Sequence, residues 1–134
     1  MSAGLLKVAV VGTGSLGKEH TRIYAELASA GKIELSGVYD LSAETARKFA
    51  EKYGVRQFSS VGDAVANAEA FSIVTPTTTH FEIAKEVLTA RKHVLVEKPM
   101  TESAEQAAEL VALARQNDCV FQVGHVERFN PVFN

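Results

Sequence analysis

Cysteine, tryptophan and clusters of basic residues are scarce or absent in this sequence of 134 residues. Cys119 is the only cysteine and there is no tryptophan, so an internal disulfide framework is excluded, and this cysteine usage is typical of a reducing compartment. The sequence has 14 Lys and Arg against 16 Asp and Glu, for a net charge of −2. Because there is no basic stripe, we expect neither nucleic acid nor a membrane surface as a partner.

Long hydrophobic runs are also missing. The first apolar run stops at Gly12, and no cationic segment precedes it, so neither a signal peptide nor a transmembrane segment is predicted. We therefore expect a cytoplasmic protein. The composition is 46% hydrophobic and 22% charged, which is typical of a globular domain, and the length suits one hydrophobic core.

Short aliphatic runs alternate with amphipathic stretches along most of the chain. Several runs are nearly continuous and β-branched, as in parallel strands that are buried on both faces. The expected strands are 6–11, 33–40, 55–59, 70–75, 93–98 and 119–124. The alternation predicts an α/β protein with a Rossmann doubly wound, mostly parallel six-stranded sheet of order 3-2-1-4-5-6 and helices on both faces.

Capping residues mark the expected helix boundaries. Ser42 precedes AETARKF, and either Thr101 or Ser103 precedes the Glu/Ala-rich segment, as N-caps do. Gly54 stands where a left-handed C-cap is expected. The third crossover, VGDAVANAE, is short and is expected to contain one or two helical turns.

The first expected strand leads directly into a glycine-rich loop and then a helical pattern. The loop residues are Gly12, Thr13, Gly14, Ser15, Leu16 and Gly17. In a dinucleotide-binding fold the first glycine allows a tight turn, the second lets the backbone approach a pyrophosphate, and the third lets the helix pack close to the sheet. The helix N-terminus offers N–H groups to phosphate. All six residues are candidate cofactor contacts; the alternative is that the glycines serve only the turn.

Asp40 ends the second expected strand, 23 residues after Gly17. A carboxylate at this position is expected to accept hydrogen bonds from the adenosine ribose hydroxyls. It would repel a 2′-phosphate, and Leu41 and Ser42 offer no arginine to neutralise one. We therefore predict NAD(H) rather than NADP(H) as the cofactor. The alternative is an exposed strand-end aspartate that caps the next helix.

Further polar residues follow the later strands, at the sheet edge where ligands of open α/β sheets gather. In TPTTTH, we expect Thr75, Pro76 and Thr77 to lie beside the cofactor, with the threonines supplying hydroxyls and a helix N-cap; a plain capping loop is the alternative. His80 is either a cofactor contact or a first-turn helix residue without a ligand. His125 and Arg128 are either nicotinamide or substrate contacts or part of a connector.

The fifth expected strand ends in Glu97, Lys98 and Pro99. Successive strand side chains point to opposite faces, so Glu97 and Lys98 are not expected to reach the same site directly. Lys98 is the better chemical candidate, because an ammonium can polarise a carbonyl or stabilise an alkoxide. The alternative is a surface Glu–Lys pair, which would contribute little energetically.

The remaining histidines and the carboxylates give no metal signal. His20 lies on the apolar stripe of the first expected helix and His93 begins a strand, so both are expected to be structural. Because no His, Cys or carboxylate cluster has the spacing of metal ligands, no metal site is predicted.

Taken together, these segments resemble a known family. VAVVGTGSLGKEH, VYD, TPTTTH, ARKHVLVEKPMT and QVGHVERFNP occur in that order and are similar to the N-terminal half of the Gfo/Idh/MocA (glucose–fructose oxidoreductase / inositol dehydrogenase) family. The resemblance implies an NAD-dependent dehydrogenase that transfers hydride between nicotinamide and a sugar, nucleotide-sugar or polyol hydroxyl. It also implies that Lys98 lies beside nicotinamide and substrate and serves in proton transfer and orientation. The ending GHVERFNP is most similar to members that act on nucleotide-linked sugars, such as UDP-N-acetylglucosamine 3-dehydrogenases.

Members of the family continue into a second domain that supplies a catalytic histidine, most substrate contacts and usually the oligomer interface. We therefore expect residues 1–125 to be the dinucleotide-binding domain and residues 126–134 a connector toward an absent C-terminal substrate domain. Binding of NAD(H) with little or no turnover is expected of this chain alone, and a homo-oligomer is a possible assembly. An NAD-sensing regulatory module is the main alternative, but it has no need of the EKP lysine. A methyltransferase is disfavoured because no late hairpin signal is present.

Overall fold

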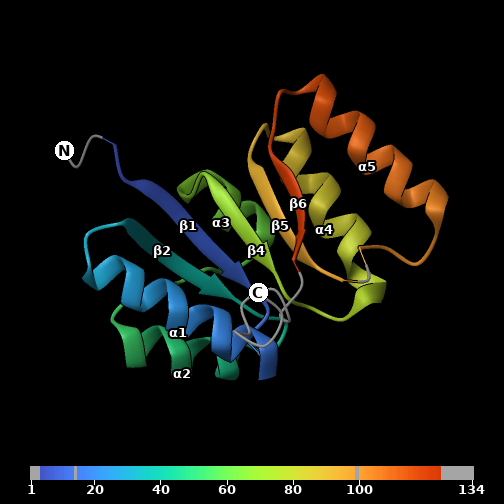
Figure 1. The fold of residues 1–134 in the computed structure, drawn as a ribbon. Helices are drawn as coiled ribbons and strands as arrows, with labels where there is room; N and C mark the ends of the chain where they lie inside the picture. Colours follow the sequence, from blue (N-terminus) through green and yellow to red (C-terminus); the bar gives the residue numbers. More distant parts are fainter. Residues whose placement is uncertain (1–3, 14, 99, 125–134) are drawn as a thin grey trace, which may run out of the picture.

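Six parallel strands form one sheet with helices on both faces (Figure 1). The computed structural model describes residues 4–13, 15–98 and 100–124. The strands are β1 (Leu6–Val11), β2 (Ile33–Tyr39), β3 (Arg56–Gln57), β4 (Ala70–Ile73), β5 (His93–Glu97) and β6 (Phe121–Gly124). The helices are α1 (Ser15–Ser29), α2 (Ala43–Tyr53), α3 (Val61–Asn67), α4 (Thr77–Thr89) and α5 (Ala104–Gln116).

The strand order is β3-β2-β1-β4-β5-β6, and every strand pair is parallel. This confirms the predicted Rossmann topology. The chain first moves outward from β1 to β3, then returns to the other side of β1 through β4. The order therefore reverses between β1 and β4, and the crevice above such a switch point is where ligands of this fold bind.

Two hydrophobic cores, one on each face of the sheet, explain why the strands read as continuous apolar runs. On one face, Val10 of β1 packs with Val38 of β2 and with Ala46 and Ala50 of α2. On the other face the core includes residues of β1, β4, β5, α3, α4 and α5. Figure 1 shows the same division, with α1 and α2 on one side of the sheet and α4 and α5 on the other. No helix within the described residues is both long and apolar enough to cross a membrane.

The third strand is much shorter than predicted. β3 covers only Arg56 and Gln57, whereas 55–59 was expected. It pairs only with Gly37 and Val38 at the edge of the sheet. Phe58 then leaves the strand and places its ring in the core, with 2% of its surface exposed. The Phe58 N–H still donates to the Val38 carbonyl over 2.8 Å.

Most predicted helix caps are confirmed. The Ser42 side chain accepts a hydrogen bond from the Thr45 N–H, and Gly54 closes α2 with a φ of 65°. Of the two candidates before α5, Ser103 is the N-cap, and its side chain accepts from the Gln106 N–H. The expected threonine N-cap of α4 is wrong: Pro76 occupies that position and makes no side-chain cap hydrogen bond.

Candidate functional site

The glycine loop turns sharply between β1 and α1. Gly12 has a φ of 101°, a conformation that favours glycine, and its N–H donates to the Tyr39 carbonyl over 2.8 Å. A Cβ on Gly12 would lie 2.8 Å from the carbonyl carbon of Val74. The loop backbone is therefore pressed against the segment that follows β4, and a side chain at this position would force the two apart.

Gly17 makes a second close approach. A Cβ there would overlap the carbonyl oxygen of Gly12 and would lie 3.2 Å from a methyl group of Val74. The absence of a side chain lets the first turn of α1 sit directly against the loop, which is the packing role predicted for the third glycine. The first turn of α1 also lacks acidic residues, so no carboxylate there opposes an anion at the helix N-terminus.

Some residues of the predicted loop cannot be placed fully. Gly14 lies outside the described residues, and for Ser15 and Leu16 only the backbone, as the start of α1, is described. His125 and Arg128, and the predicted connector at 126–134, also lie outside the described residues. The candidate site is therefore built from the strand ends β1, β2, β4 and β5.

Asp40 binds the glycine loop directly. Its Oδ2 accepts from the Thr13 N–H over 2.7 Å and from the Thr13 hydroxyl over 3.0 Å. Its Oδ1 accepts from the Ser42 N–H over 2.8 Å. Thr13 is 2% exposed, while Asp40 is half-buried. The carboxylate thus joins the glycine loop to the residue that caps α2, and Asp40 remains partly exposed.

The segment after β4 is held by its own hydroxyls and by a histidine. The Thr79 hydroxyl donates to Thr75 Oγ1 over 2.6 Å. His80 is buried, with Nε2 lying 2.7 Å from the Thr75 carbonyl oxygen and Nδ1 lying 3.3 Å from that of Met100. Pro76 is exposed, and Thr77 begins α4. The side chain of His80 therefore fastens the strand-end loop from inside, while Thr75 to Thr77 form its surface.

Glu97 and Lys98, at the end of β5, differ in burial. Glu97 is 6% exposed, and its Oε1 lies 2.8 Å from His20 Nε2. Lys98 is exposed, and its N–H donates to the Gly124 carbonyl over 3.3 Å. Among the described residues, no ion pair includes Lys98. The surface Glu–Lys pair considered above is therefore not formed, and Lys98 is exposed directly after the end of β5.

His20 is the centre of a polar cluster that the sequence did not reveal. Its Nδ1 lies 2.7 Å from the Ser72 hydroxyl of β4, and its Nε2 contacts Glu97 of β5. The ring of Tyr24 packs edge-on against His20 at 6.4 Å between centroids. Burial raises the pKa of the Tyr24 phenol, a hydrogen bond with Ser72 opposes this, and the Glu97 charge adds to it.

His20 was predicted to be a structural residue on the apolar stripe of α1; it does contact strands of the sheet, but its hydrogen-bond partners are the polar side chains Ser72 and Glu97. A histidine at an apolar helix position is typical of a core residue. The sequence alone does not show which side chains of the sheet it contacts. The available signal was Ser72, a lone hydroxyl within the apolar strand AFSI. His93 begins β5 as predicted, and its Nδ1 accepts from the Val120 N–H over 3.0 Å.

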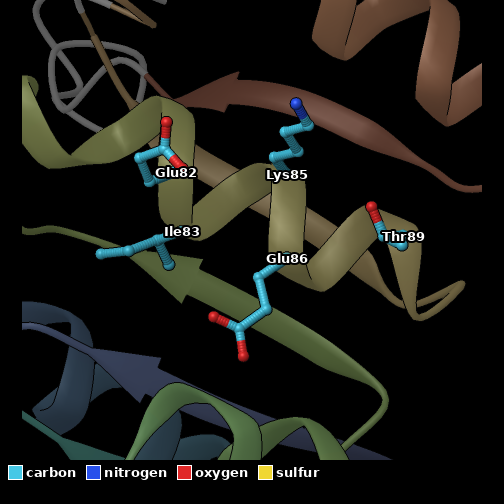
Figure 2. A pocket seen from close by; sticks show the side chains of 5 residues that line it. All are labelled: Glu82, Ile83, Lys85, Glu86 and Thr89. Carbon is cyan, nitrogen blue, oxygen red and sulfur yellow. The ribbon is translucent and has the colours of Figure 1, made fainter.

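The structure also has a surface pocket, but it is unsuited to a dinucleotide. It has a volume of about 340 Å³ and is lined by five residues of α4: Glu82, Ile83, Lys85, Glu86 and Thr89. Figure 2 shows their side chains fanning outward instead of converging. Two carboxylates line the pocket, and Lys85 is paired with Glu109 over 2.9 Å, so a pyrophosphate would meet net negative charge. No cluster of metal-ligating side chains occurs in the part of the chain that the structure describes.

Comparison with known proteins agrees with this geometry. The family model described as "Oxidoreductase family, NAD-binding Rossmann fold" (GFO_IDH_MocA) matches residues 6–125. The chain is 38% identical to UDP-N-acetylglucosamine 3-dehydrogenase from Acidithiobacillus ferrooxidans over 94% of its own length and 39% of that protein's. It is 32% identical to glucose-6-phosphate 3-dehydrogenase from Bacillus subtilis over 76% of its length and 28% of that protein's.

Solved structures give the same result. The structure of the A. ferrooxidans enzyme superimposes with a TM-score of 0.88 over 95% of this chain and 40% of that one, at 38% identity. GenD2 from gentamicin A biosynthesis, in complex with NAD, gives a TM-score of 0.84 over 92% of this chain and 35% of that one, at 31% identity. The chain thus spans about two fifths or less of these relatives. It belongs to the Gfo/Idh/MocA oxidoreductase family, and residues 6–125 form the NAD-binding Rossmann fold of that family.

Proposed function

We propose that this chain holds NAD(H) in the crevice between the ends of β1 and β4, with the pyrophosphate at the glycine loop and the N-terminus of α1. The observation that carries this proposal is the contact of Asp40 with Thr13, which places a carboxylate beside the loop. The cofactor would then span from Asp40 at the adenosine end to Lys98 at the nicotinamide end. Residues Gly12 to Gly17, Thr75, Pro76, Thr77, His80, Glu97, His125 and Arg128 are the further proposed contacts.

The proposed preference is for NAD(H) over NADP(H). Asp40 presents a carboxylate where the ribose hydroxyls of the adenosine would lie, and a hydroxyl donates to it while a phosphate is repelled. Leu41 is 78% exposed and carries no charge, and Ser42 is used as the N-cap of α2. Neither residue can neutralise a 2′-phosphate.

The proposed reaction is hydride transfer between nicotinamide and a hydroxyl or ketone of a sugar, nucleotide sugar or polyol. Bound NAD⁺ would accept the hydride from the substrate carbon as the hydroxyl becomes a carbonyl. Lys98 is the proposed catalytic residue: its exposed side chain at the carboxyl edge can hold the substrate oxygen and exchange its proton. The relatives named as dehydrogenases of UDP-N-acetylglucosamine and of glucose 6-phosphate support this substrate class, with a nucleotide-linked sugar as the narrower proposal.

The proposed domain division follows from the same relatives. Residues 1–125 would form the dinucleotide-binding domain and residues 126–134 a connector, and the substrate contacts would come from protein beyond this chain. We expect little or no turnover from the chain alone, because most of the length of the relatives is not represented in it. A cytoplasmic location and a homo-oligomeric enzyme complete the proposal.

Calorimetric titration of the chain with NADH, NADPH and S-adenosylmethionine tests the cofactor assignment. We expect NADH to bind most tightly and S-adenosylmethionine not to bind. A Gly17→Ala variant should weaken NADH binding, because its methyl group would overlap Gly12. Gly62→Ala is the matched control, since a Cβ there meets nothing closer than 3.5 Å. Equal affinities of the two variants would remove the glycine loop from the proposed site.

A further inference from the structure

One histidine connects the helix of the phosphate loop to both strands on the nicotinamide side of the sheet. His20 lies on α1, three residues after Gly17. Its two ring nitrogens contact Ser72 in β4 and Glu97 in β5, at 2.7 and 2.8 Å. These distances are typical of well-formed hydrogen bonds. The imidazole therefore connects α1 to the neighbouring strands β4 and β5.

Glu97 determines which atom donates at one of the two ring nitrogens of His20. An ionised Glu97 carboxylate can only accept, so His20 Nε2 must carry the proton that it receives. His20 Nδ1 and the Ser72 hydroxyl share the second hydrogen bond, for which either atom can supply the proton. The ring of Tyr24, on the same helix, packs edge-on against the imidazole. Both ring nitrogens of His20 are therefore hydrogen-bonded to buried side chains, which favours a rigid unit.

The buried position of the Glu97 carboxylate depends on its hydrogen bond with His20. The side chain of Glu97 is 8% exposed and that of His20 is 14% exposed, and a carboxylate buried to this extent is costly unless it is hydrogen-bonded. Glu97 is also the last residue of β5, directly before Lys98. Whatever fixes the Glu97 side chain therefore fixes the strand end from which Lys98 projects.

We infer that His20 is a positioning residue for the nicotinamide half of the site, because it orients Glu97 through Nε2 and thereby holds the strand end that carries Lys98. This inference rests on the proposed function. It assigns His20 a role only in the part of the site that would hold the nicotinamide half of the cofactor. The glycine loop and Asp40, which serve the adenosine and pyrophosphate half, are held by contacts of their own.

The two halves can be separated by comparing NADH with ADP-ribose, which lacks the nicotinamide. Two variants divide the role of the ring. His20→Gln places an amide nitrogen where Nε2 lies and can still donate to Glu97, whereas His20→Asn mimics Nδ1 and can reach only Ser72. We expect His20→Asn to weaken NADH binding about tenfold, the scale of a lost hydrogen bond to a charged group, and ADP-ribose binding less than about twofold. His20→Gln should retain most of the NADH affinity.

His93→Asn is the matched control. His93 lies at the other end of β5, and its Nδ1 accepts a hydrogen bond from a backbone N–H. An asparagine can replace this contact only in part, so the variant perturbs the same strand at a point away from the site. It should leave the affinities for both ligands unchanged. Thermal unfolding of each variant establishes that folded protein is being titrated.

Several outcomes would overturn the inference. If His20→Asn lowered the affinity for ADP-ribose as much as that for NADH, the histidine would be merely structural. If it changed neither affinity, the histidine would have no role in the site. If wild-type protein bound neither ligand, the proposed function itself would fail. A variant that does not fold leaves a direct measurement on wild-type protein: nitrogen NMR shifts of His20 should show a protonated Nε2, and an unprotonated Nε2 would exclude donation to Glu97.

Discussion

The carboxylate of Asp40 offers the most quantitative test of the cofactor assignment. Its two oxygens provide about four acceptor positions, and three are used by the Thr13 N–H, the Thr13 hydroxyl and the Ser42 N–H. One position is therefore left for a ribose hydroxyl. A second hydroxyl would have to displace the Thr13 hydroxyl, whose 3.0 Å contact is the longest of the three.

Replacement of Asp40 by asparagine should therefore remove one charge-assisted hydrogen bond to the ribose. Such a bond contributes about 1.5–3 kcal/mol, which corresponds to a loss of NADH affinity of about 10- to 150-fold. Binding of NADPH should fall much less, because the charge that repels its phosphate is also removed. The ratio of the two dissociation constants should thus move toward unity.

The assay is calorimetric titration of wild-type and variant chains with NADH and NADPH. Glu69→Gln is the matched control, because Glu69 Oε1 also accepts a backbone N–H, from Lys7 over 2.9 Å, but at the start of β4, on the opposite edge of the sheet. It should bind both cofactors as the wild type does. If Asp40→Asn and Glu69→Gln had the same NADH affinity, or if wild-type protein bound NADPH as tightly as NADH, the role given to Asp40 would be refuted.

Three further predictions concern stability. Gly37→Ala should lower the free energy of unfolding by about 1–3 kcal/mol, because its Cβ would overlap the Arg56 carbonyl and the Phe58 ring; an unchanged denaturant midpoint would contradict this. The pKa of Tyr24 is raised by burial, so stability should fall as the pH rises above the ordinary tyrosine range, and Tyr24→Phe should flatten that loss in an unfolding titration. The pKa of Asp63 is lowered, chiefly by the hydrogen bond from the Ser59 backbone N–H, so its contribution is present at neutral pH and lost as the pH falls through the carboxyl range. Asp63→Asn should make the unfolding midpoint less sensitive to acid, and equal acid sensitivity would count against this contact.

The sheet order could be predicted because it follows from a simple pattern. Each parallel strand is covered on both faces, so its apolar run is nearly continuous, and the amphipathic stretches between runs allow only right-handed crossovers. Strand ends were less predictable. β3 ends at Gln57 and the next residue, Phe58, is buried in the core, and the sequence pattern of 55–59 gave no local signal for so short a strand.

The candidate site was predictable where a residue acts through the backbone. Gly12 and Gly17 are required because main chain approaches main chain closely at these positions. Such a position must be glycine, and glycines at a fixed spacing can be recognised in the sequence. The cluster of His20, Ser72 and Glu97 leaves no such mark, because its members are 52 and 77 residues apart from the histidine. Only the packing of α1 on the sheet brings them within hydrogen-bonding distance.

The central claim is that NAD(H) lies across the carboxyl ends of β1, β2, β4 and β5. Backbone amide NMR of the chain during titration with NADH tests it most directly. We predict the largest shifts at Thr13, Asp40, Thr75, Thr77 and Lys98, with little change along the far half of α4. Shifts concentrated at the α4 pocket of Glu82 to Thr89, or no shifts at millimolar NADH, would contradict the account.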